Sequence, residues 1–398
     1  MKRAAEVYPK VDETRLSAER AVLALLEYCK KENWAGYDPY DGLSSRLLAA
    51  LPFSRSWIFR LLITQGLKRS PVNVRSFLLV PKEENPKACA LFCRSLIRLS
   101  DSGFLTEDSV VFERLERLLA LRSKGYSNSC WGYNFDWQSR GLLVPKFMPN
   151  VICTTFGGNA LIDAYEKYGR GEFADAAASA GEFLVNGLNM THENGALCFS
   201  YTPLDHAQVH NANLLGAAFL GRLAQLTGRE QFLNVAERAA RFSLSRQSDD
   251  GSWPYGEGET QRWIDNFHTG YNLVALKTLA SVLKDNALNG AISRGLEFYV
   301  NHFFTADGIP KYYHDKVWPV DIHSVAQSIV TLSELASLNK GAIPLAAKVC
   351  RWALANMQSE KGYFFYQKTR FYENRISYMR WSQAWMLYAL AAFLSTGA

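Results

Sequence analysis

The sequence predicts an all-α protein, an (α/α)6 toroid in which about six helical hairpins close into a ring, with short β-hairpins at the rim. A glycine- and aromatic-rich turn, a polar stretch and an apolar helix recur at intervals of about 55 residues, from Gly195, Gly251, Gly308 and Gly362. A period of this size is typical of an array of supersecondary units. Helices with one apolar face alternate with helices that are apolar nearly all round, and no stretch has the two-residue period of a large sheet.

In the stretch 229–246, Phe232, Ala236 and Ala239 share one helix face while Glu237 and Arg241 point mostly away from it. Such a one-sided pattern predicts a half-buried outer helix. Outer helices of this kind are expected near 14–31, 106–123, 172–188, 229–246, 288–303 and 342–357. Helices without a polar face are expected inside the ring. They fall near 84–100, 150–168, 205–227, 264–284, 321–338 and 377–395.

Turn chemistry completes the outline. Gly169 and Gly228 are placed to end two inner helices, and Asn150 is placed to begin one. Short β-hairpins are expected at three glycine-led turns, 251–256, 308–313 and 362–367. The stretch 37–83 is the least regular and is predicted to hold an extra helix or a lid. Without a visible linker, residues 1–398 are assigned to a single domain.

The composition indicates a large core. Of the 398 residues, 48% are hydrophobic and only 21% are charged, so disorder is not indicated. A net charge of +6 is mild for this length and predicts no nucleic-acid partner. Basic residues concentrate at Arg55, Arg60, Lys68, Arg69, Arg75 and Lys82. They form either a solvated or partner-facing surface, or a surface that attracts an anionic polymer or a membrane.

The cysteines and the N-terminus favour the cytoplasm. The seven Cys are odd in number and contain no CxxC motif, so a disulfide framework is not expected. The first residues lack the apolar core of a signal peptide, and no stretch of 18 uncharged apolar residues predicts a membrane-spanning helix. The oligomeric state stays open.

In such a toroid, the segments that enter the inner helices meet at one rim, where a ligand site is expected. The first polar cluster there contains Trp131, Tyr133, Asp136, Trp137 and Arg140. Aromatic rings with a carboxylate and a guanidinium suit a sugar that has an acidic substituent, because Arg binds carboxylates bidentately. The alternative is an aromatic loop with a structural Asp136–Arg140 pair.

Two histidines, His206 and His210, are four residues apart and so predicted to share a helix face. This spacing can bind a metal. Since no third ligand is evident, we expect substrate hydrogen bonding or a structural pair instead, with no metal and no cofactor.

Asp265 and His268 lie three residues apart at a predicted helix start, and the pairing returns one repeat later as Asp321 and His323. Asp265 could be a plain N-cap, could orient His268, or could serve as a general acid or base. The turns before these pairs, and the last helix start, supply further aromatic and basic candidates for substrate binding. These are Trp253, Tyr255, Tyr313, Trp318, Arg380 and Trp381.

Two reaction schemes fit these residues. Hydrolysis of a glycosidic bond needs two carboxylates, for which Asp136, Asp265 and Asp321 are candidates. Elimination or epimerisation at a uronate needs a base and a cation that neutralises the carboxylate. For that scheme the candidate bases are His268, His323 and Tyr313, and the candidate cations are Arg140 and Arg380.

The helix alternation, the period and the aromatic–acidic rim resemble the six-hairpin α/α-toroid glycosidases and lyases. That group includes unsaturated glucuronyl hydrolases, sugar 2-epimerases, polysaccharide lyases and the helical domain of glucuronyl C5-epimerases. Two stretches, 131–140 and 149–169, are similar to uncharacterised proteins from bacterial exopolysaccharide and lipopolysaccharide clusters. The resemblance implies a hydrolase, or a uronate lyase or epimerase, that acts on an acidic saccharide in surface-polysaccharide metabolism.

Two other functions compete with this one. The chain could be a non-catalytic glycan-binding or scaffold protein of a polysaccharide assembly system. The stretch from Gln247 to Trp253 also resembles the QxxxGxW motif of triterpene cyclases, which in those proteins ties helix ends to turns. The chain has neither the DxDD nor the DDxxD signature of terpenoid enzymes, so the match is interpreted as shared toroid construction.

Overall fold

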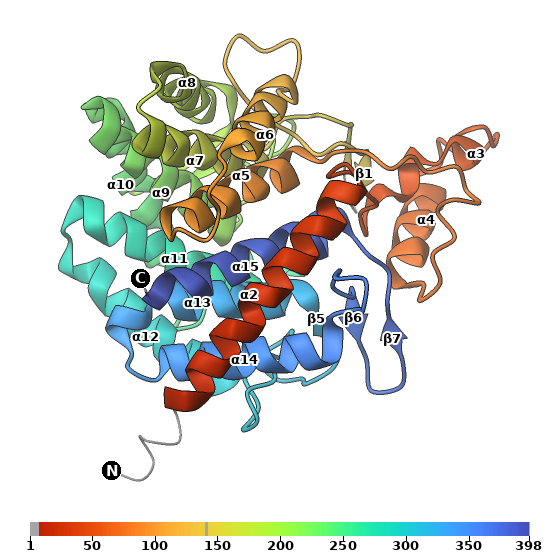
Figure 1. Cartoon of the computed structure of the whole chain (residues 1–398). Coiled ribbons are helices and arrows are strands. Elements are labelled where there is room, and N and C mark those ends of the chain that lie inside the picture. The colour runs from red at the N-terminus through yellow and green to blue at the C-terminus, as the bar shows by residue number, and fades with distance from the viewer. Residues whose placement is uncertain (1–7, 140–141, 398) are drawn as a thin grey trace.

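The protein forms an (α/α)6 toroid in a computed structural model, which describes residues 8–139 and 142–397 (Figure 1). The inner ring consists of α5 (Pro86–Asp101), α7 (Val151–Tyr168), α9 (His210–Thr227), α11 (Asn266–Leu283), α13 (Ile322–Glu334) and α15 (Trp385–Leu394). A π-helical turn, η4 (Met379–Ala384), leads directly into α15. The outer ring consists of α2 (Tyr8–Lys31), α6 (Ser109–Ala120), α8 (Gly171–Gly187), α10 (Glu230–Leu244), α12 (Asn286–His302) and α14 (Ala342–Met357). The predicted fold class is therefore confirmed.

The ring closes where the two ends of the chain meet. Each inner helix packs on the next one in sequence, and α15 packs back on α5. The N-terminal helix α2 covers this junction by packing on α14 and α15, as Figure 1 shows where the red helix crosses the blue ones. This closure brings segments that are more than 300 residues apart to one rim.

Side-chain caps begin four of the inner helices. Asn85, Asn150, Asp265 and Asp321 each accept hydrogen bonds from backbone N–H groups of the first turn. At the opposite end, Gly169 is one of the residues that ends an inner helix in the left-handed conformation, as the sequence predicts. Since N-caps must satisfy free N–H groups, polar side chains collect at the rim formed by the helix N-termini.

The short strands lie in the loops between helices. β1 (Trp137–Gln138) pairs with β2 (Leu143–Val144), β3 (Met190–Glu193) pairs with β4 (Ala196–Phe199), and β6 (Gln367–Lys368) lies between β5 (Val320–Asp321) and β7 (Glu373–Asn374). The hairpins predicted at 251–256, 308–313 and 362–367 are tight turns with isolated bridges in place of paired strands. Antiparallel bridges close the turns at Gly308 and Gly362, Phe304 with Pro310 and Gln358 with Phe364, whereas Gly256 bridges to Val209 of a neighbouring repeat. Gln367 then begins β6.

The stretch 37–83 contains η1 (Asp41–Ser44), α3 (Arg46–Ala49) and α4 (Trp57–Arg69). Figure 1 shows α3 and α4 projecting to one side of the toroid. Whether this segment acts as a lid, and whether the chain is one domain, remain predictions.

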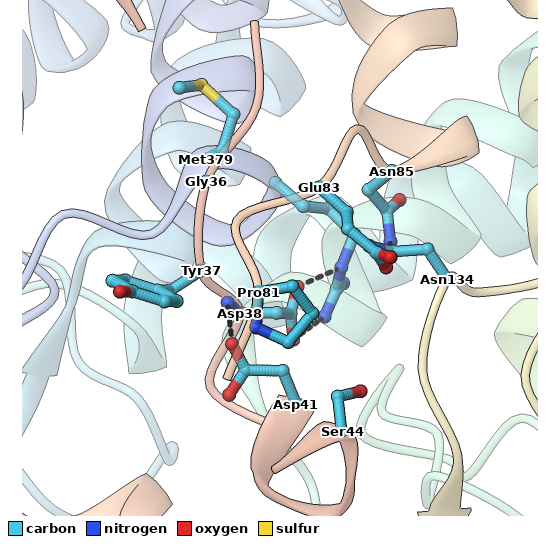
Figure 2. A pocket seen from close by; sticks show the side chains of 11 residues that line it. Gly36, Tyr37, Asp38, Asp41, Ser44, Pro81, Glu83, Asn85, Asn134 and Met379 are labelled. Atoms are coloured by element: carbon cyan, nitrogen blue, oxygen red, sulfur yellow. Dashed lines mark hydrogen bonds and ion pairs between the residues drawn. The ribbon is translucent and has the colours of Figure 1, made fainter. Parts of the chain in front are cut away.

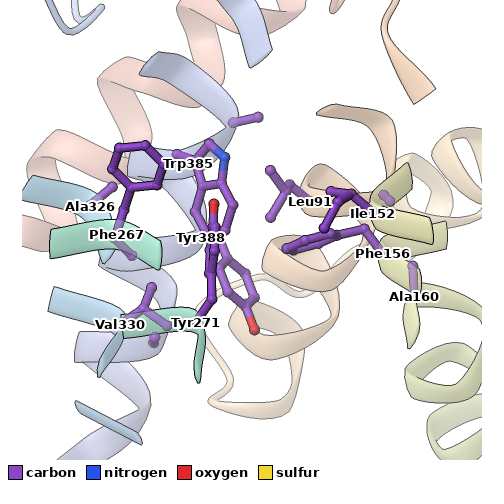
Figure 3. Packing of buried hydrophobic residues seen from close by; sticks show 14 of the residues in the cluster. Leu91, Ile152, Phe156, Ala160, Phe267, Tyr271, Ala326, Val330, Trp385 and Tyr388 are labelled. Atoms are coloured by element: carbon purple, nitrogen blue, oxygen red, sulfur yellow. The ribbon is translucent and has the colours of Figure 1, made fainter. Parts of the chain in front are cut away.

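The core fills the interior of the inner ring. Rings of Phe156, Tyr271, Trp385 and Tyr388 meet on its axis (Figure 3). All seven cysteines are buried free thiols, as the absence of a disulfide framework predicts. Among the described residues, no helix is both long enough and apolar enough to cross a bilayer.

Candidate functional site

Asp265 and His268 form a hydrogen-bonded pair at the start of α11. Asp265 is the N-cap: Oδ1 accepts the backbone N–H of His268 at 2.9 Å, and Oδ2 accepts the His268 Nδ1–H at 2.7 Å. The indole N–H of Trp263 donates to the same Oδ2 at 2.9 Å. Because the carboxylate holds the proton on Nδ1, the neutral imidazole has its lone pair on Nε2.

His268 is the more accessible member of the pair. Its side chain is 20% exposed, whereas the Asp265 side chain is fully buried. Nε2 has no hydrogen-bond partner within the described part of the chain. The imidazole packs against Phe267 and Tyr255, and Tyr255 stacks on Trp263 with ring centroids 4.6 Å apart. An aromatic wall therefore flanks a histidine nitrogen that is free to exchange a proton.

The second Asp–His pair has a different arrangement. Asp321 caps α13, and its oxygens accept the backbone N–H of His323, the indole N–H of Trp381 and the amide of Gln367. Burial raises the pKa of the Asp321 carboxyl to about 6. The pair does not repeat the ring-to-carboxylate contact, because Asp321 bonds to the backbone of His323 and not to its imidazole.

His323 lies deeper than His268. Its Nε2 shares a hydrogen bond with the hydroxyl of Tyr271, and its Nδ1 is buried without a partner among the described residues. Burial, together with the nearby positive charge of Lys87, holds the pKa of His323 well below its usual value. Phe267 lies against both imidazoles, with centroid distances of 4.2 Å to His268 and 4.7 Å to His323. The two imidazoles thus lie against the same phenyl ring.

Arg380 is not free to bind a substrate carboxylate as predicted. It makes a bidentate ion pair with Asp38, at 2.6 and 2.8 Å, and its side chain is only 4% exposed. The Asp38 backbone N–H donates to Asp41, which pairs with Arg75 at 2.6 Å. Figure 2 shows these carboxylates around a small cavity of about 10 Å³. The network ties the stretch 37–83 to η4, the turn that leads into the last inner helix.

Lys87 is a functional candidate that the sequence analysis missed. Its ammonium lies over the rings of Phe156, Trp385 and Tyr271, at 4.5, 5.1 and 5.5 Å from the centroids. Burial, helped by the charge of Arg380, lowers the pKa of Lys87 to about 7. The only signal in the sequence was a lysine directly after the Asn–Pro start of an apolar helix, Asn85-Pro86.

The first predicted cluster is partly assembled at the rim. The Tyr133 hydroxyl contacts that of Tyr201 at 3.2 Å, and the rings of Trp137 and Tyr201 meet edge to face. Asp136 accepts the backbone N–H of Lys146 and so joins the two residues that flank the β1–β2 hairpin. Arg140 lies outside the described residues.

Two predicted substrate-binding tryptophans belong to the core. Trp131 and Trp253 are 0% and 2% exposed, and their indole N–H groups donate to the carbonyls of Leu118 and Ser243. Gln247 donates to the carbonyl of Gly251 and to that of the neighbouring outer helix, as expected for a motif that ties turns to helix ends. Neither tryptophan can contact a substrate.

The prediction that His206 and His210 share a helix face is wrong, because α9 begins only at His210. The preceding residues form a turn in which Asp205 accepts three backbone N–H groups. His206 is exposed, while His210 is buried and bonded to Glu257 and Ser243. In the described part of the chain, no group of three His, Cys, Asp or Glu side chains could hold a metal.

Trp381, Tyr313 and Trp318 are the remaining candidates. Trp381 donates to the Asp321 carboxylate, Tyr313 is half-buried and forms a backbone bridge with Asp265, and Trp318 is 36% exposed. Lys68, from α4, donates to the hydroxyl of Tyr40, and Asp321 and Tyr313 help to raise its pKa. Helix α4 thus brings the ammonium group of Lys68 to the rim, a position that the sequence could not predict.

Comparisons with known proteins agree on the fold. No protein-family model matches the chain, and no curated protein matches it in sequence. An unsaturated glucuronyl hydrolase specific for heparin superposes with a TM-score of 0.61 at 13% identity, over 97% of each chain. A cellobiose 2-epimerase from Bacillus thermoamylovorans gives 0.60 at 11% identity, over 79% of this chain and 88% of its own.

A GH76 α-mannanase from Bacteroides thetaiotaomicron superposes with a TM-score of 0.57 at 14% identity, over 79% of this chain and 84% of its own. The chain is therefore similar in architecture to toroids named as carbohydrate hydrolases and epimerases. At these identities, the likeness establishes the (α/α)6 toroid and nothing finer.

Proposed function

We propose that the protein is a cytoplasmic enzyme of bacterial surface-polysaccharide metabolism, which acts on an acidic saccharide by proton transfer as a uronate epimerase or lyase. The observation that carries this proposal is the Asp265–His268 pair. A carboxylate fixes the tautomer of an imidazole whose other nitrogen is unpaired, beside the stacked rings of Tyr255 and Trp263. This is the arrangement that a general base requires.

In this reaction, His268 Nε2 takes the proton from the sugar carbon next to the carboxylate, and the electron pair moves into that carboxylate. A proton delivered from water to the opposite face gives the epimer, and Nε2 then releases its proton to solvent. Expulsion of the β-substituent, whose oxygen takes up the proton now on Nε2, instead leaves an unsaturated uronate. Since Arg380 is saturated by Asp38, the cation suited to the substrate carboxylate is Lys68, which lies close enough to Asp321 and Tyr313 to feel their charge.

Glycoside hydrolysis is the second candidate, favoured by the pKa of Asp321. A carboxyl group that burial holds near 6 is suited to protonate a leaving oxygen. Asp321 and Asp265 are, however, only 1% and 2% exposed, and both accept several hydrogen bonds. Proton transfer by His268 needs no rearrangement of these bonds.

The test is turnover of acidic oligosaccharides by the wild type and by His268→Ala. We expect His268→Ala to lower kcat by about 10²- to 10⁴-fold, the usual contribution of a general base. Asp265→Asn keeps an N-cap, so we expect it to fold normally and to lose about 10²-fold through the wrong tautomer. Three readouts separate the reactions: deuterium uptake from D₂O for epimerisation, ultraviolet absorbance of an unsaturated uronate for elimination, and new reducing ends for hydrolysis.

Equal turnover in wild type and His268→Ala would contradict the proposal. Binding of oligosaccharides without any product would indicate a glycan-binding protein. Reducing ends that require Asp321 but not His268 would indicate the hydrolase.

A further inference from the structure

The protruding segment 46–79 exposes large apolar side chains that nothing in the toroid covers. We call these side chains, together with the exposed arginines Arg46, Arg55 and Arg69, the apolar–basic surface. Its apolar members are Leu47, Phe53, Trp57, Ile58, Leu62, Val72, Phe77 and Leu79, which are 45–82% exposed. Eight large apolar side chains exposed on one segment are more than the scattered single residues of an ordinary surface, and such a concentration normally marks a site of interaction.

Helix α4 has one side packed on the protein and an apolar side exposed to solvent. Thr64 and Leu67 are buried against the body of the protein, whereas Ile58 and Leu62, one turn apart, are 59% and 66% exposed. Trp57 begins the same helix and is 45% exposed. A surface helix ordinarily turns its polar face to water, so α4 presents an apolar face that lacks its partner.

The charge of the segment indicates that its partner is negatively charged. Between Asp41 and Glu83 the sequence contains seven Lys or Arg residues and no acidic residue. Arg46, Arg55 and Arg69 are exposed, and none makes an ion pair with a carboxylate of the described residues. The arginines complete the apolar–basic surface, whose partner must be both apolar and anionic.

We propose that the apolar–basic surface docks the protein on a bilayer that contains anionic lipids. Exposed Trp, Ile and Leu side chains would enter the headgroup region, and the arginines would meet the lipid phosphates. With only 13 residues, α4 is too short to span a bilayer and would lie in its surface. An anionic polysaccharide would match the arginines but leave the apolar face in water. A second copy would bring like charges together.

The surface continues toward the candidate site. The side chain of Asn374, at the end of the β6–β7 hairpin, donates to the carbonyl of Ser70, and the hairpin tip exposes Phe371 by 88%. Lys68, on α4, reaches the rim. Docking would therefore hold the rim close to the lipid headgroups.

The experiment is co-sedimentation of the full chain with vesicles of phosphatidylglycerol and phosphatidylcholine, compared with vesicles of phosphatidylcholine alone. We expect binding to the anionic vesicles only. Replacing the outward pair, in Ile58→Gln/Leu62→Gln, should weaken that binding tenfold or more. Removing three charges, in Arg46→Gln/Arg55→Gln/Arg69→Gln, should weaken it by about a hundredfold, at the usual contribution of a surface cation.

The matched control is Leu16→Gln/Leu23→Gln on α2, where both leucines are 56% exposed but lie outside the segment. It should bind vesicles like the wild type, and all variants should keep the wild-type circular dichroism. Absence of wild-type binding to anionic vesicles would overturn the proposal, as would an equal loss in the control. It would also be overturned if Ile58→Gln/Leu62→Gln instead dissociated a dimer in sedimentation analysis, or if the wild type bound alginate and no vesicle.

Discussion

The two ends of the inner ring both collect charged side chains, yet they use them differently. At the end formed by the helix C-termini, a cavity of about 590 Å³ is lined by basic residues such as Arg94 and Arg222, and by acids such as Asp163. Asp163 accepts from Arg94 at 2.6 Å and from Arg222 at 2.8 Å. At the N-terminal rim Asp265 and Asp321 serve as caps and His268 Nε2 is left unpaired among the described residues, although Asp38 and Asp41 form ion pairs there too.

Helix capping explains the arrangement at the N-terminal rim. The ion pairs at the other end are not a dipole effect, because Arg94 and Arg222 lie before the last turns of α5 and α9. N-termini favour carboxylates, which satisfy the free N–H groups and retain an oxygen for a side chain such as His268. The larger cavity contains several mutually neutralised ion pairs, while the proposed base, His268, lies at the rim formed by the helix N-termini. If His268 is the base, cavity size alone does not identify the site.

Among the variants that distinguish the two ends of the inner ring, Asp163→Asn is expected to have the largest effect on stability. The variant removes the carboxylate that two largely buried guanidinium groups share, leaving Arg222 paired with the exposed Glu166, and should cost about 3 kcal/mol of unfolding free energy. Burial opposes ionisation of Asp163, but the charges of Arg94 and Arg222 outweigh it and lower its pKa below the usual range. This stabilisation is present above the unfolded-state pKa and is lost as the pH falls through the folded-state value.

Urea unfolding measures the loss, with Glu166→Gln as the control. Glu166 also pairs with Arg222, but it is 57% exposed and should contribute less than about 1 kcal/mol. Turnover should survive Asp163→Asn, whereas Asp265→Asn should lose turnover at nearly unchanged stability. The reverse pattern would show that the two ends have been assigned the wrong way round.

The sequence was sufficient for the fold because the relevant signals are local. Apolar periodicity, the caps Asn150 and Asp265, and the spacing of Asp265 and His268 can all be seen within one turn of helix. The environment of Lys87 could not be predicted, because its three rings come from three other helices. The ion pair of Arg380 with Asp38 spans 342 residues and exists only because the ring closes.

Other predictions failed because the burial of a side chain depends on residues far away in the sequence. Trp253 and Trp263 both lie in an aromatic turn before α11, but only Trp253 ends the stretch that resembles QxxxGxW, the one sequence signal of a structural role. The packing of the outer helices, which brings Gly295 against the Trp253 ring, shows that Trp253 is a core residue. Hydrogen-bonding partners are equally invisible: His210 meets Glu257 across 47 residues.

A second, intermediate effect should appear in the pH dependence of stability. Burial raises the folded-state pKa of Asp321 from 3.8 to about 6, so its contribution is present below the unfolded value and is lost as the pH rises through about 6. The whole shift corresponds to about 3 kcal/mol. We expect Asp321→Asn to gain about 1–2 kcal/mol at pH 7, because its amide replaces only some of the accepted hydrogen bonds.

Urea unfolding of wild type and variant between pH 5 and 8 tests this. The variant curve should be flatter, although Asp41, whose pKa burial also raises to about 6, leaves part of the dependence in place. Identical slopes for the two proteins would mean that Asp321 is ionised in the folded state throughout this range.

The smallest expected effect concerns the exposed half of the aromatic wall. Trp263 is 39% exposed, stacks on Tyr255 and donates to Asp265, so Trp263→Ala should cost less than about 1 kcal/mol of stability. The variant also removes a ring on which a sugar could stack. Because such stacking contributes about 0.5–1.5 kcal/mol, its loss should raise the KM for an acidic oligosaccharide by about 2- to 13-fold. Trp253→Phe is the contrasting variant: without its indole N–H, the carbonyl of Ser243 loses its side-chain donor and keeps only backbone contacts such as that from Arg246, so stability should fall while KM stays unchanged. Steady-state kinetics with urea unfolding distinguishes the two tryptophans, and a KM that rises equally in both variants would show that the wall does not bind substrate.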